Sequence, residues 1–286
     1  MKYIFCSLWD SAYMLKGLTL INSLIATCED NFRLYVMAID AAVYKELPRI
    51  EQVVQLSLTD IEDEELAKIR KQRTWQEYIW TLTPTLMNAV FELYEPGHLA
   101  YIDADTFFFQ PPEELYKEVG GASIAAIPHR FEPGSDAETR CLPNGIYNVN
   151  WVYAKNDRDG RNFVRHWDLL CKEWCFYKNE HGKFADQGYL NFLLPEYCGH
   201  TVKHLGSNLA PWNQMQYSYR VDKNGLYISD GNREDPLIFY HTHELLHDEN
   251  GNITRKTNWP LHPIIDEYIY EIYADWLKRA AESKVG

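Results

Sequence analysis

Two aspartates, Asp103 and Asp105, end an apolar run in the segment LAYIDADTFFF. Side chains two positions apart on an extended backbone point to the same side, so both carboxylates can reach one cation. Their hard oxygen atoms suit Mn²⁺ or Mg²⁺, and these ions complete their coordination with phosphate oxygens. The pair therefore predicts a divalent metal site that holds a diphosphate.

A second copy of this spacing, Asp157-Arg158-Asp159, stands directly before Gly160. Turn-forming residues flank the second copy, whereas an apolar strand precedes the first, so the first pair is the better metal candidate. A turn or capping role is the alternative interpretation of the first pair.

The charge of the chain limits its partners. Its 286 residues include 41 Asp and Glu against 28 Lys and Arg, a formal net charge of -13. This balance disfavours nucleic acid, because binding to a phosphate backbone needs clustered cations. It also repels a diphosphate, so a site for one must supply a metal or local basic side chains.

The cysteines and the apolar segments indicate a cellular location. Six cysteines lack paired CxxC spacing, so we expect free thiols and no zinc site. Ser7 and Asp10 break the first apolar run, which is then too short for a signal peptide, and no segment has the length of a membrane span. We predict a cytoplasmic protein without a transmembrane segment, with peripheral contact at the inner membrane face left open.

Short apolar runs alternate with amphipathic stretches along the first half of the chain, a pattern typical of βα units. We expect Asp60 to cap a charged helix, and Pro84 to end one helix near Thr83 and start or kink the next. The expected strands cover residues 3–8, 32–39, 53–56, 99–103, 123–127, 146–154, 201–204 and 237–242, and the main expected helices cover 15–24, 75–94, 162–177 and 261–282.

This order of elements predicts an α/β fold in a single domain, residues 1–286. Its central sheet should be mixed but mostly parallel, with flanking helices and a C-terminal helix at 261–282. Such sheets bind ligands beyond the carboxyl ends of their strands, which is where Asp103 and Asp105 are expected.

The segment YIDADTFFF resembles the metal-binding segment of nucleotide-diphospho-sugar transferases of the GT-A fold. The segments CSLWDSAY, TWQEYIWTLTP, GIYNVNWVYAKND, ADQGYLNF and IFYHTHEL follow the same order. They are similar to retaining galactosyltransferase-like and glycogenin-like enzymes and to bacterial relatives from polysaccharide clusters. The resemblance covers residues 3–245 and implies a nucleotide-binding part at about 1–110 and a donor-sugar and acceptor part at about 111–250.

The resemblance implies roles for single residues around the nucleotide and the metal. Asp10 and Tyr13 match the loop that holds the nucleoside, where a ring covers the base and a carboxylate accepts its imide hydrogen. His241 matches the histidine that completes the metal shell, with His243 as its substitute. A turn aspartate, a packing tyrosine and a structural histidine are the alternatives.

The donor sugar has its own expected contacts. Asn148, Asp186 and Gln187 match residues that hold its hydroxyls in the family. We expect Asp186 to lie nearest the anomeric carbon, where a carboxylate stabilises an oxocarbenium ion. A helix N-cap is the alternative for Asp186.

Two departures from the family pattern concern positive charge. The segment after His241 lacks the family's glycine and lysine, and no arginine lies beside Tyr78 on its helix. Arg73 is the nearest basic residue and serves as the predicted substitute, with Tyr78 also in the predicted donor site. Trp212 and Asn213 are predicted on the acceptor side, with loop packing as the alternative.

We therefore predict an enzyme that moves a hexose from a UDP-sugar to an acceptor hydroxyl with Mn²⁺ or Mg²⁺, with retention, in surface polysaccharide or glycan synthesis. The acceptor would be a glycan or a lipid-linked glycan. Two alternatives stay open: a degenerate sugar-nucleotide-binding protein, and a metal-dependent nucleotidyltransferase or hydrolase on a similar sheet.

Overall fold

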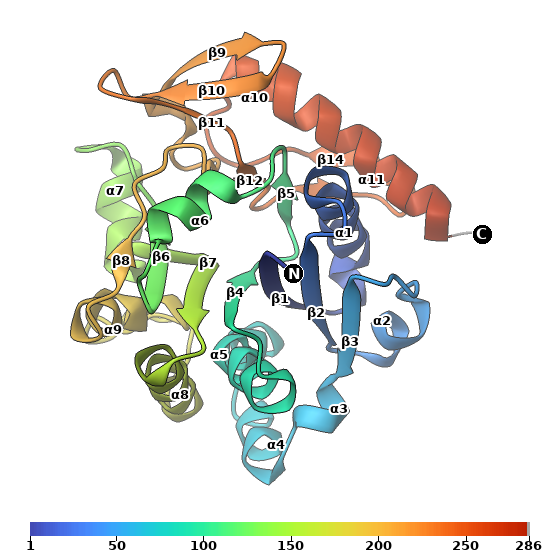
Figure 1. Cartoon of the computed structure of the whole chain (residues 1–286), viewed down its shortest axis with the longest axis vertical. Coiled ribbons are helices and arrows are strands. Elements are labelled where there is room, and N and C mark those ends of the chain that lie inside the picture. Colours follow the sequence, from blue (N-terminus) through green and yellow to red (C-terminus); the bar gives the residue numbers. More distant parts are fainter. Residues whose placement is uncertain (285–286) are drawn as a thin grey trace.

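The computed structural model describes residues 1–284 and is built on a seven-stranded sheet with the order β3-β2-β1-β4-β7-β6-β8 (Figure 1). Only β7 runs antiparallel to its neighbours, β4 and β6, so the predicted mixed but mostly parallel sheet is confirmed. The strands are β1 (Tyr3–Trp9), β2 (Phe32–Ala38), β3 (Val53–Ser57), β4 (His98–Ile102), β6 (Ile124–Pro128), β7 (Tyr147–Lys155) and β8 (His200–Thr201).

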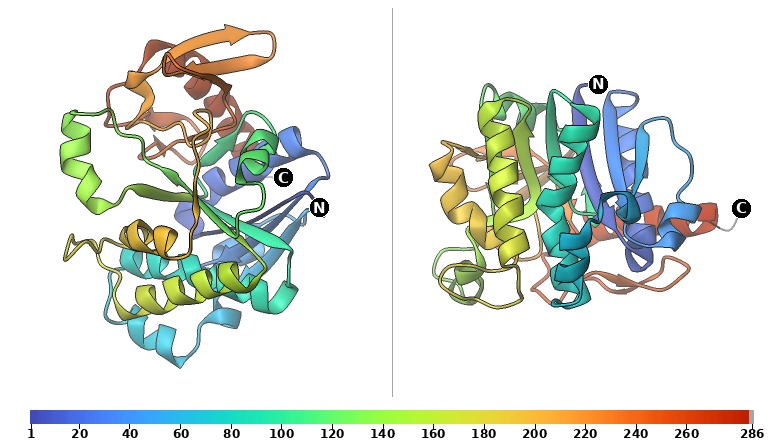
Figure 2. Two further views of the ribbon diagram at one scale, coloured as in Figure 1. Left: turned by 60° about the vertical axis from the view of Figure 1, so that its left-hand side comes forward. Right: turned by 90° about the horizontal axis from the view of Figure 1, so that it is seen from below.

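Helices cover both faces of this sheet, because alternate side chains of a buried strand enter different cores. Phe5 of β1 belongs to the core under α1 and α11, whereas Cys6 belongs to the core under α5 and α8. Helices α5 and α8 lie side by side in Figure 2. The helices are α1 (Met14–Cys28), α2 (Ala41–Glu46), α3 (Leu58–Ile61), α4 (Glu64–Arg70), α5 (Trp75–Tyr94), α6 (Glu113–Val119), α7 (Asp136–Cys141), α8 (Arg158–Glu173), α9 (Leu190–Glu196), α10 (Pro263–Ile265) and α11 (Glu271–Lys284).

Close packing places α1 against the end of β1. A Cβ atom on Gly17 would come within 2.4 Å of the Trp9 ring, which is itself 2% exposed. Only glycine fits this contact, and α1 therefore starts directly beside the carboxyl edge of the sheet. This contact determines where the first residues of α1 lie relative to the acidic pair.

Smaller sheets lie outside the seven-stranded sheet. Strand β5 (Thr106–Phe108) pairs antiparallel with β12 (Phe239–His241). A three-stranded sheet contains β9 (Ser218–Asp222), β10 (Gly225–Ser229) and β11 (Glu234–Pro236), and a hairpin joins β13 (Leu246–His247) to β14 (Ile253–Arg255). The C-terminal helix is confirmed and packs against α1 (Figure 1). Within residues 1–284, no helix combines the length and the apolar character that a membrane crossing requires.

Several local predictions are wrong. Helix α5 is continuous through Pro84, because burial of its neighbours Leu82 and Leu86 outweighs the cost of one proline. Asp63 rather than Asp60 caps α4, with its side chain accepting from the Leu66 amide. The segment at Asp157 is a helix start and not a turn, since its carboxylate caps α8 at Gly160 N.

Candidate metal centre

Strand β4 ends at Ile102 and places Asp103 and Asp105 at the carboxyl edge of the sheet. The pairing of β5 with β12 sets His241 opposite Thr106, directly beside this edge. The backbone amide and the hydroxyl of Thr242 both donate to the Asp105 carbonyl, at 2.9 and 2.8 Å. Two distant parts of the chain thus meet in a register that backbone hydrogen bonds define.

The three side chains form one compact group, which we call the acidic cluster: Asp103, Asp105 and His241. The Nε2 atom of His241 lies 3.1 Å from Asp105 Oδ1 and 3.8 Å from Asp103 Oδ2. One ligand atom from each residue lies within 4.8 Å of the others. Two carboxylates and one imidazole suit Mn²⁺ or Mg²⁺, and the Asp103 side chain is 30% exposed to solvent.

His243 is less suited to this shell. Burial and, to a smaller extent, the charge of His241 lower the pKa of His243 to about 4. Its ring meets that of His241 at a centroid distance of 5.4 Å, but it does not join the acidic cluster. The geometry therefore favours His241 over its predicted substitute.

The carboxylates of the site differ in proton affinity. Burial raises the pKa of Asp103 to about 6, partly offset by His241. Burial would also raise the pKa of Asp105, but His241 and Lys16 hold it well below its usual range. Asp105 in turn raises the pKa of His241 against the lowering effect of burial. At neutral pH the acidic cluster therefore retains anionic ligands.

Three buried asparagines, which we call the asparagine row, hold the backbone at Asp103: Asn148, Asn150 and Asn208. Asn150 Oδ1 accepts from the Asp103 amide at 3.1 Å, and Asn150 Nδ2 donates to Asn208 Oδ1 at 3.1 Å. Asn208 Nδ2 donates to Asn148 Oδ1 at 3.2 Å, so the predicted sugar contact Asn148 lies in the same row. The left-handed backbone of Asn208, with φ of 56°, suits asparagine. Its contact with a sugar hydroxyl stays a prediction.

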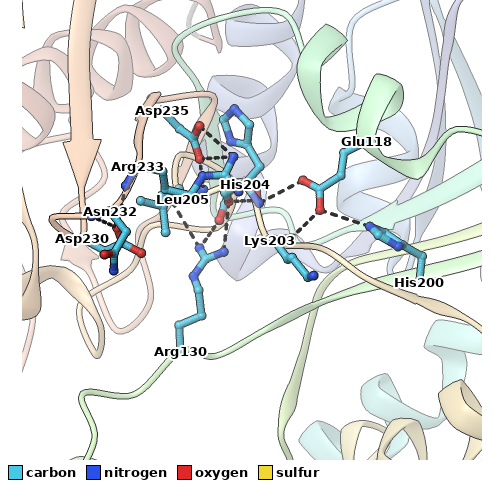
Figure 3. A network of polar contacts seen from close by, with 11 residues as sticks. Glu118, Arg130, His200, Lys203, His204, Leu205, Asp230, Asn232, Arg233 and Asp235 are labelled. Carbon is cyan, nitrogen blue, oxygen red and sulfur yellow. Dashed lines mark hydrogen bonds and ion pairs between the residues drawn. The ribbon is translucent and has the colours of Figure 1, made fainter.

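The loop that carries Asn208 is fastened by a charged network (Figure 3). Arg130 donates to the carbonyls of His204, Leu205, Ser207 and Asn208. Glu118 accepts from the amides of Lys203 and His204 at 2.6 and 2.9 Å. An 890 Å³ cavity adjoins Glu118, and its lining residues include no member of the acidic cluster. The network acts as a support for the site.

The predicted nucleoside residues lie beside the acidic cluster. Asp105, burial and Asp103 raise the pKa of Tyr13, a residue that is 44% exposed. Asp10 accepts from the Ala12 amide at 3.1 Å and from Trp75 Nε1 at 2.8 Å. Tyr13 is thus partly accessible beside the acidic cluster, whereas Asp10 already has hydrogen-bond partners, and the nucleoside contacts of both residues stay predictions.

Two of the predicted sugar residues, Asp186 and Gln187, lie directly before α9. Asp186 is 4% exposed, and burial together with the charge of Asp103 raises its pKa to about 7. Its side chain makes no capping hydrogen bond, although the residue stands before a helical turn. Gln187 Nε2 donates to the Asn144 carbonyl at 3.0 Å. Asp186 therefore belongs to the electrostatic surroundings of the acidic cluster.

The structure places the other predicted residues differently. Arg73 donates to Thr81 and, at 2.7 Å, to the Lys172 carbonyl. Tyr78 is fully buried, with its hydroxyl donating to Glu62 at 2.6 Å. These contacts attach both side chains to the helical layer rather than to the acidic cluster. Their roles in binding the nucleotide-sugar donor stay predictions.

Trp212 and Asn213, predicted on the acceptor side, lie next to the imidazoles. The Trp212 ring meets those of His241 and His243 at 5.3 Å each. The amide of Asn213 is buried and donates to the His129 carbonyl at 2.9 Å. Trp212 thus helps to hold the metal-site histidine, and contact of either residue with an acceptor stays a prediction.

The sequence prediction missed Lys16. This lysine is 5% exposed, and its Nζ atom lies 3.7 Å from Asp105 Oδ2. It also lies 4.6 Å from the centre of the Tyr13 ring. The three-residue spacing of Tyr13 and Lys16 on a helical segment could have indicated this shared side.

Two proteins of Bacillus subtilis are similar to this chain in sequence. No protein-family model matches the chain. YfnD of Bacillus subtilis (strain 168), an uncharacterized protein, is 32% identical over 247 residues, which span 83% of this chain and 76% of YfnD. YfnF of the same organism, also uncharacterized, is 28% identical over 254 residues, covering 84% of this chain and 81% of YfnF.

Solved structures share the fold at low sequence identity. A crystal structure of the galactosyltransferase LgtC with donor and acceptor sugar analogs superposes with a TM-score of 0.60 at 11% identity, covering 96% of this chain and 95% of LgtC. The glycosyltransferase GlyE of Streptococcus pneumoniae TIGR4 gives a TM-score of 0.55 at 12% identity, covering 99% of this chain and 63% of GlyE. The chain therefore has the fold of the GT-A nucleotide-sugar transferases and belongs to the same protein family as YfnD of Bacillus subtilis.

Proposed function

We propose that this protein is a metal-dependent glycosyltransferase that moves a hexose from a UDP-sugar to an acceptor hydroxyl. The observation that carries the proposal is the acidic cluster, Asp103, Asp105 and His241, at the carboxyl edge of a sheet shared with glycosyltransferases. Ligands of open α/β sheets bind at this edge. The sugar analogs in the LgtC complex support a donor and an acceptor as the two substrates.

The acidic cluster would hold Mn²⁺ or Mg²⁺, which supplies Lewis acidity and neutralises the leaving diphosphate when bound. Tyr13 would cover the base of the nucleotide, because its ring is exposed beside the acidic cluster. The asparagine row keeps the Asp103 backbone in place, so that its carboxylate needs little reorganisation to meet a ligand.

Asp186 would stabilise the sugar during transfer. Its carboxyl group is buried and senses the charge of Asp103, which supports a role for Asp186 near the metal and the donor sugar. A carboxylate there stabilises an oxocarbenium ion, and direct substitution on one face of the sugar gives retention without a strong enzymic base. If a covalent intermediate forms instead, Asp186 is the nucleophile.

The acceptor class follows only from the sequence resemblance. A surface polysaccharide or another glycan, free or lipid-linked and reached from the cytoplasm, is the acceptor that we propose. The B. subtilis relatives carry no assigned activity that would narrow this class.

A donor-hydrolysis screen over common nucleotide sugars with Mn²⁺ tests the proposal. Wild-type protein should release nucleotide from one donor, and Asp103→Asn and Asp105→Asn should abolish release. Asp159→Asn makes the same change in the second aspartate pair and should leave nucleotide release unchanged, since Asp159 is exposed in the first turn of α8. Equal release by all four proteins would remove the acidic cluster from the chemistry. Mn²⁺-dependent binding of UDP without turnover of any donor would favour the degenerate binding protein.

A further inference from the structure

Lys16 carries a buried positive charge beside the acidic cluster. Its side chain is 7% exposed and that of Asp105 is 8% exposed, with 3.7 Å between Nζ and Oδ2. A lysine is almost never this buried unless an anion compensates it. The separation exceeds a normal hydrogen bond, so the three N–H donors of the ammonium group are not committed to Asp105.

The two oxygens of Asp105 face different side chains. Oδ1 faces His241 Nε2 at 3.1 Å, on the side of the metal ligands, whereas Oδ2 faces Lys16. The centre of the Tyr13 ring lies 4.6 Å from Lys16 Nζ. Lys16 is therefore close to both the proposed nucleoside contact and the metal ligands, the two groups that a diphosphate would join.

Charge balance indicates what this position needs. The carboxylates of Asp103 and Asp105 offset the charge of a divalent ion, so the two negative charges of a nucleotide-sugar diphosphate stay uncompensated. Nearby arginines are already engaged, since Arg73 binds Thr81 and the Lys172 carbonyl and Arg130 binds four carbonyls of the loop at 204–208. The segment after His241 supplies no lysine.

We infer that Lys16 is the residue of this chain that binds the donor diphosphate, pairing with Asp105 until metal and nucleotide arrive. The inference rests on the proposed function, because it names the group that recognises the phosphates of that donor. With a divalent ion bound to the acidic cluster, the ammonium group of Lys16 would be repelled from Asp105 and would turn toward the phosphate oxygens. A lysine suits this role because its charge is compact and its stem flexible.

Binding measurements on Lys16→Met test the inference without turnover. We expect Mn²⁺ to bind as in wild type or more tightly, because a competing cation is gone. UDP in saturating Mn²⁺ should bind roughly 10- to 100-fold more weakly, whereas uridine, which has no phosphates, should bind unchanged. Lys16→Arg should restore most of the UDP affinity.

Lys172→Met is the matched control. Lys172 is also largely buried and pairs with the buried Asp168 at 3.1 Å, but it lies on α8 outside the acidic cluster. This variant should bind UDP as wild type does. If Lys16→Met does not fold, judged by thermal melting, Lys16→Gln replaces it in the same titrations.

The outcomes separate the two proposals. Binding of UDP by Lys16→Met at wild-type affinity would overturn the inference and leave the proposed function standing. Equal weakening for UDP and uridine would also overturn it, since a purely structural role damages the whole pocket. Failure of wild-type protein to bind UDP with Mn²⁺ would remove the proposed function and this inference together.

Discussion

His241 Nε2 lies 3.1 Å from Asp105 Oδ1, although His241 belongs to β12 and Asp105 to the turn between β4 and β5, far apart in the chain. The β5–β12 pairing produces this contact, and the Thr242 amide and hydroxyl secure it at the Asp105 carbonyl. A shift of one residue in this register would turn His241 away and bring a neighbouring side chain to the site. The ligand geometry therefore depends on a short, buried strand pair.

Removal of the imidazole should weaken metal binding. We expect His241→Ala to lower the Mn²⁺ affinity by roughly 10- to 100-fold, because one of three protein ligands is lost. His243→Ala is the matched control and should change the affinity by less than about threefold, because His243 lies outside the acidic cluster. Titration monitored by Mn²⁺ electron paramagnetic resonance measures both. A larger loss of Mn²⁺ affinity in His243→Ala than in His241→Ala would assign the metal-ligand role to His243 instead.

The raised pKa of Asp186 predicts a pH-dependent cost in stability. The pKa of the Asp186 carboxyl is 3.8 in the unfolded chain and about 7 in the folded protein. The free energy of unfolding therefore falls as the pH rises between these values. Asp186→Asn should then raise the free energy of unfolding at pH 8 by up to about 4 kcal/mol and change it little near pH 4. Urea unfolding at both pH values measures the difference.

Asp159→Asn, measured at both pH values, controls for a general effect of removing an acid. Equal stabilisation of Asp186→Asn at pH 4 and pH 8 would show that its pKa is not raised. Donor hydrolysis by Asp186→Asn should fall even where its stability rises, because the stabilising carboxylate is lost.

The asparagine row should couple stability to metal binding. Asn150→Ala removes the acceptor of the Asp103 amide and the Thr106 hydroxyl and the donor to Asn208 Oδ1, all of them buried or partly buried. We expect a loss of about 2–4 kcal/mol in the free energy of unfolding and a weaker Mn²⁺ site. Urea unfolding and Mn²⁺ titration measure the two effects. Asn224→Ala, in an exposed turn, should change neither.

The contact between Gly17 and Trp9 should be needed for the position of α1. In Gly17→Ala the new Cβ would lie 2.4 Å from the Trp9 ring, so helix or ring must shift. We expect a loss of about 1–3 kcal/mol in thermal unfolding, together with weaker UDP binding because Tyr13 and Lys16 move. Gly121→Ala adds a Cβ into open space and is the control. Unchanged UDP binding in a destabilised Gly17→Ala would separate α1 from the donor site.

The sequence by itself determined the sheet and its acidic edge. Long apolar runs such as β1 and β2 have no polar face, so they had to be central strands, and the amphipathic stretches between them had to cover the sheet. The aspartate pair directly after β4 then had to lie at the carboxyl edge. These are local patterns, and local periodicity was enough to predict them.

Local patterns could not predict contacts between distant segments. Pro84 remains within α5 because burial of its neighbours Leu82 and Leu86 in one core outweighs its helix-breaking cost. Asp63 caps α4 in place of Asp60 through one hydrogen bond from Leu66 N. The choice of His241 over His243 depends on the β5–β12 register, and the burial of Lys16 beside Asp105 depends on how closely α1 approaches β1 through Gly17. Only the tertiary structure decided these points, because each depends on distances between side chains whose separation in the sequence carries no geometric information.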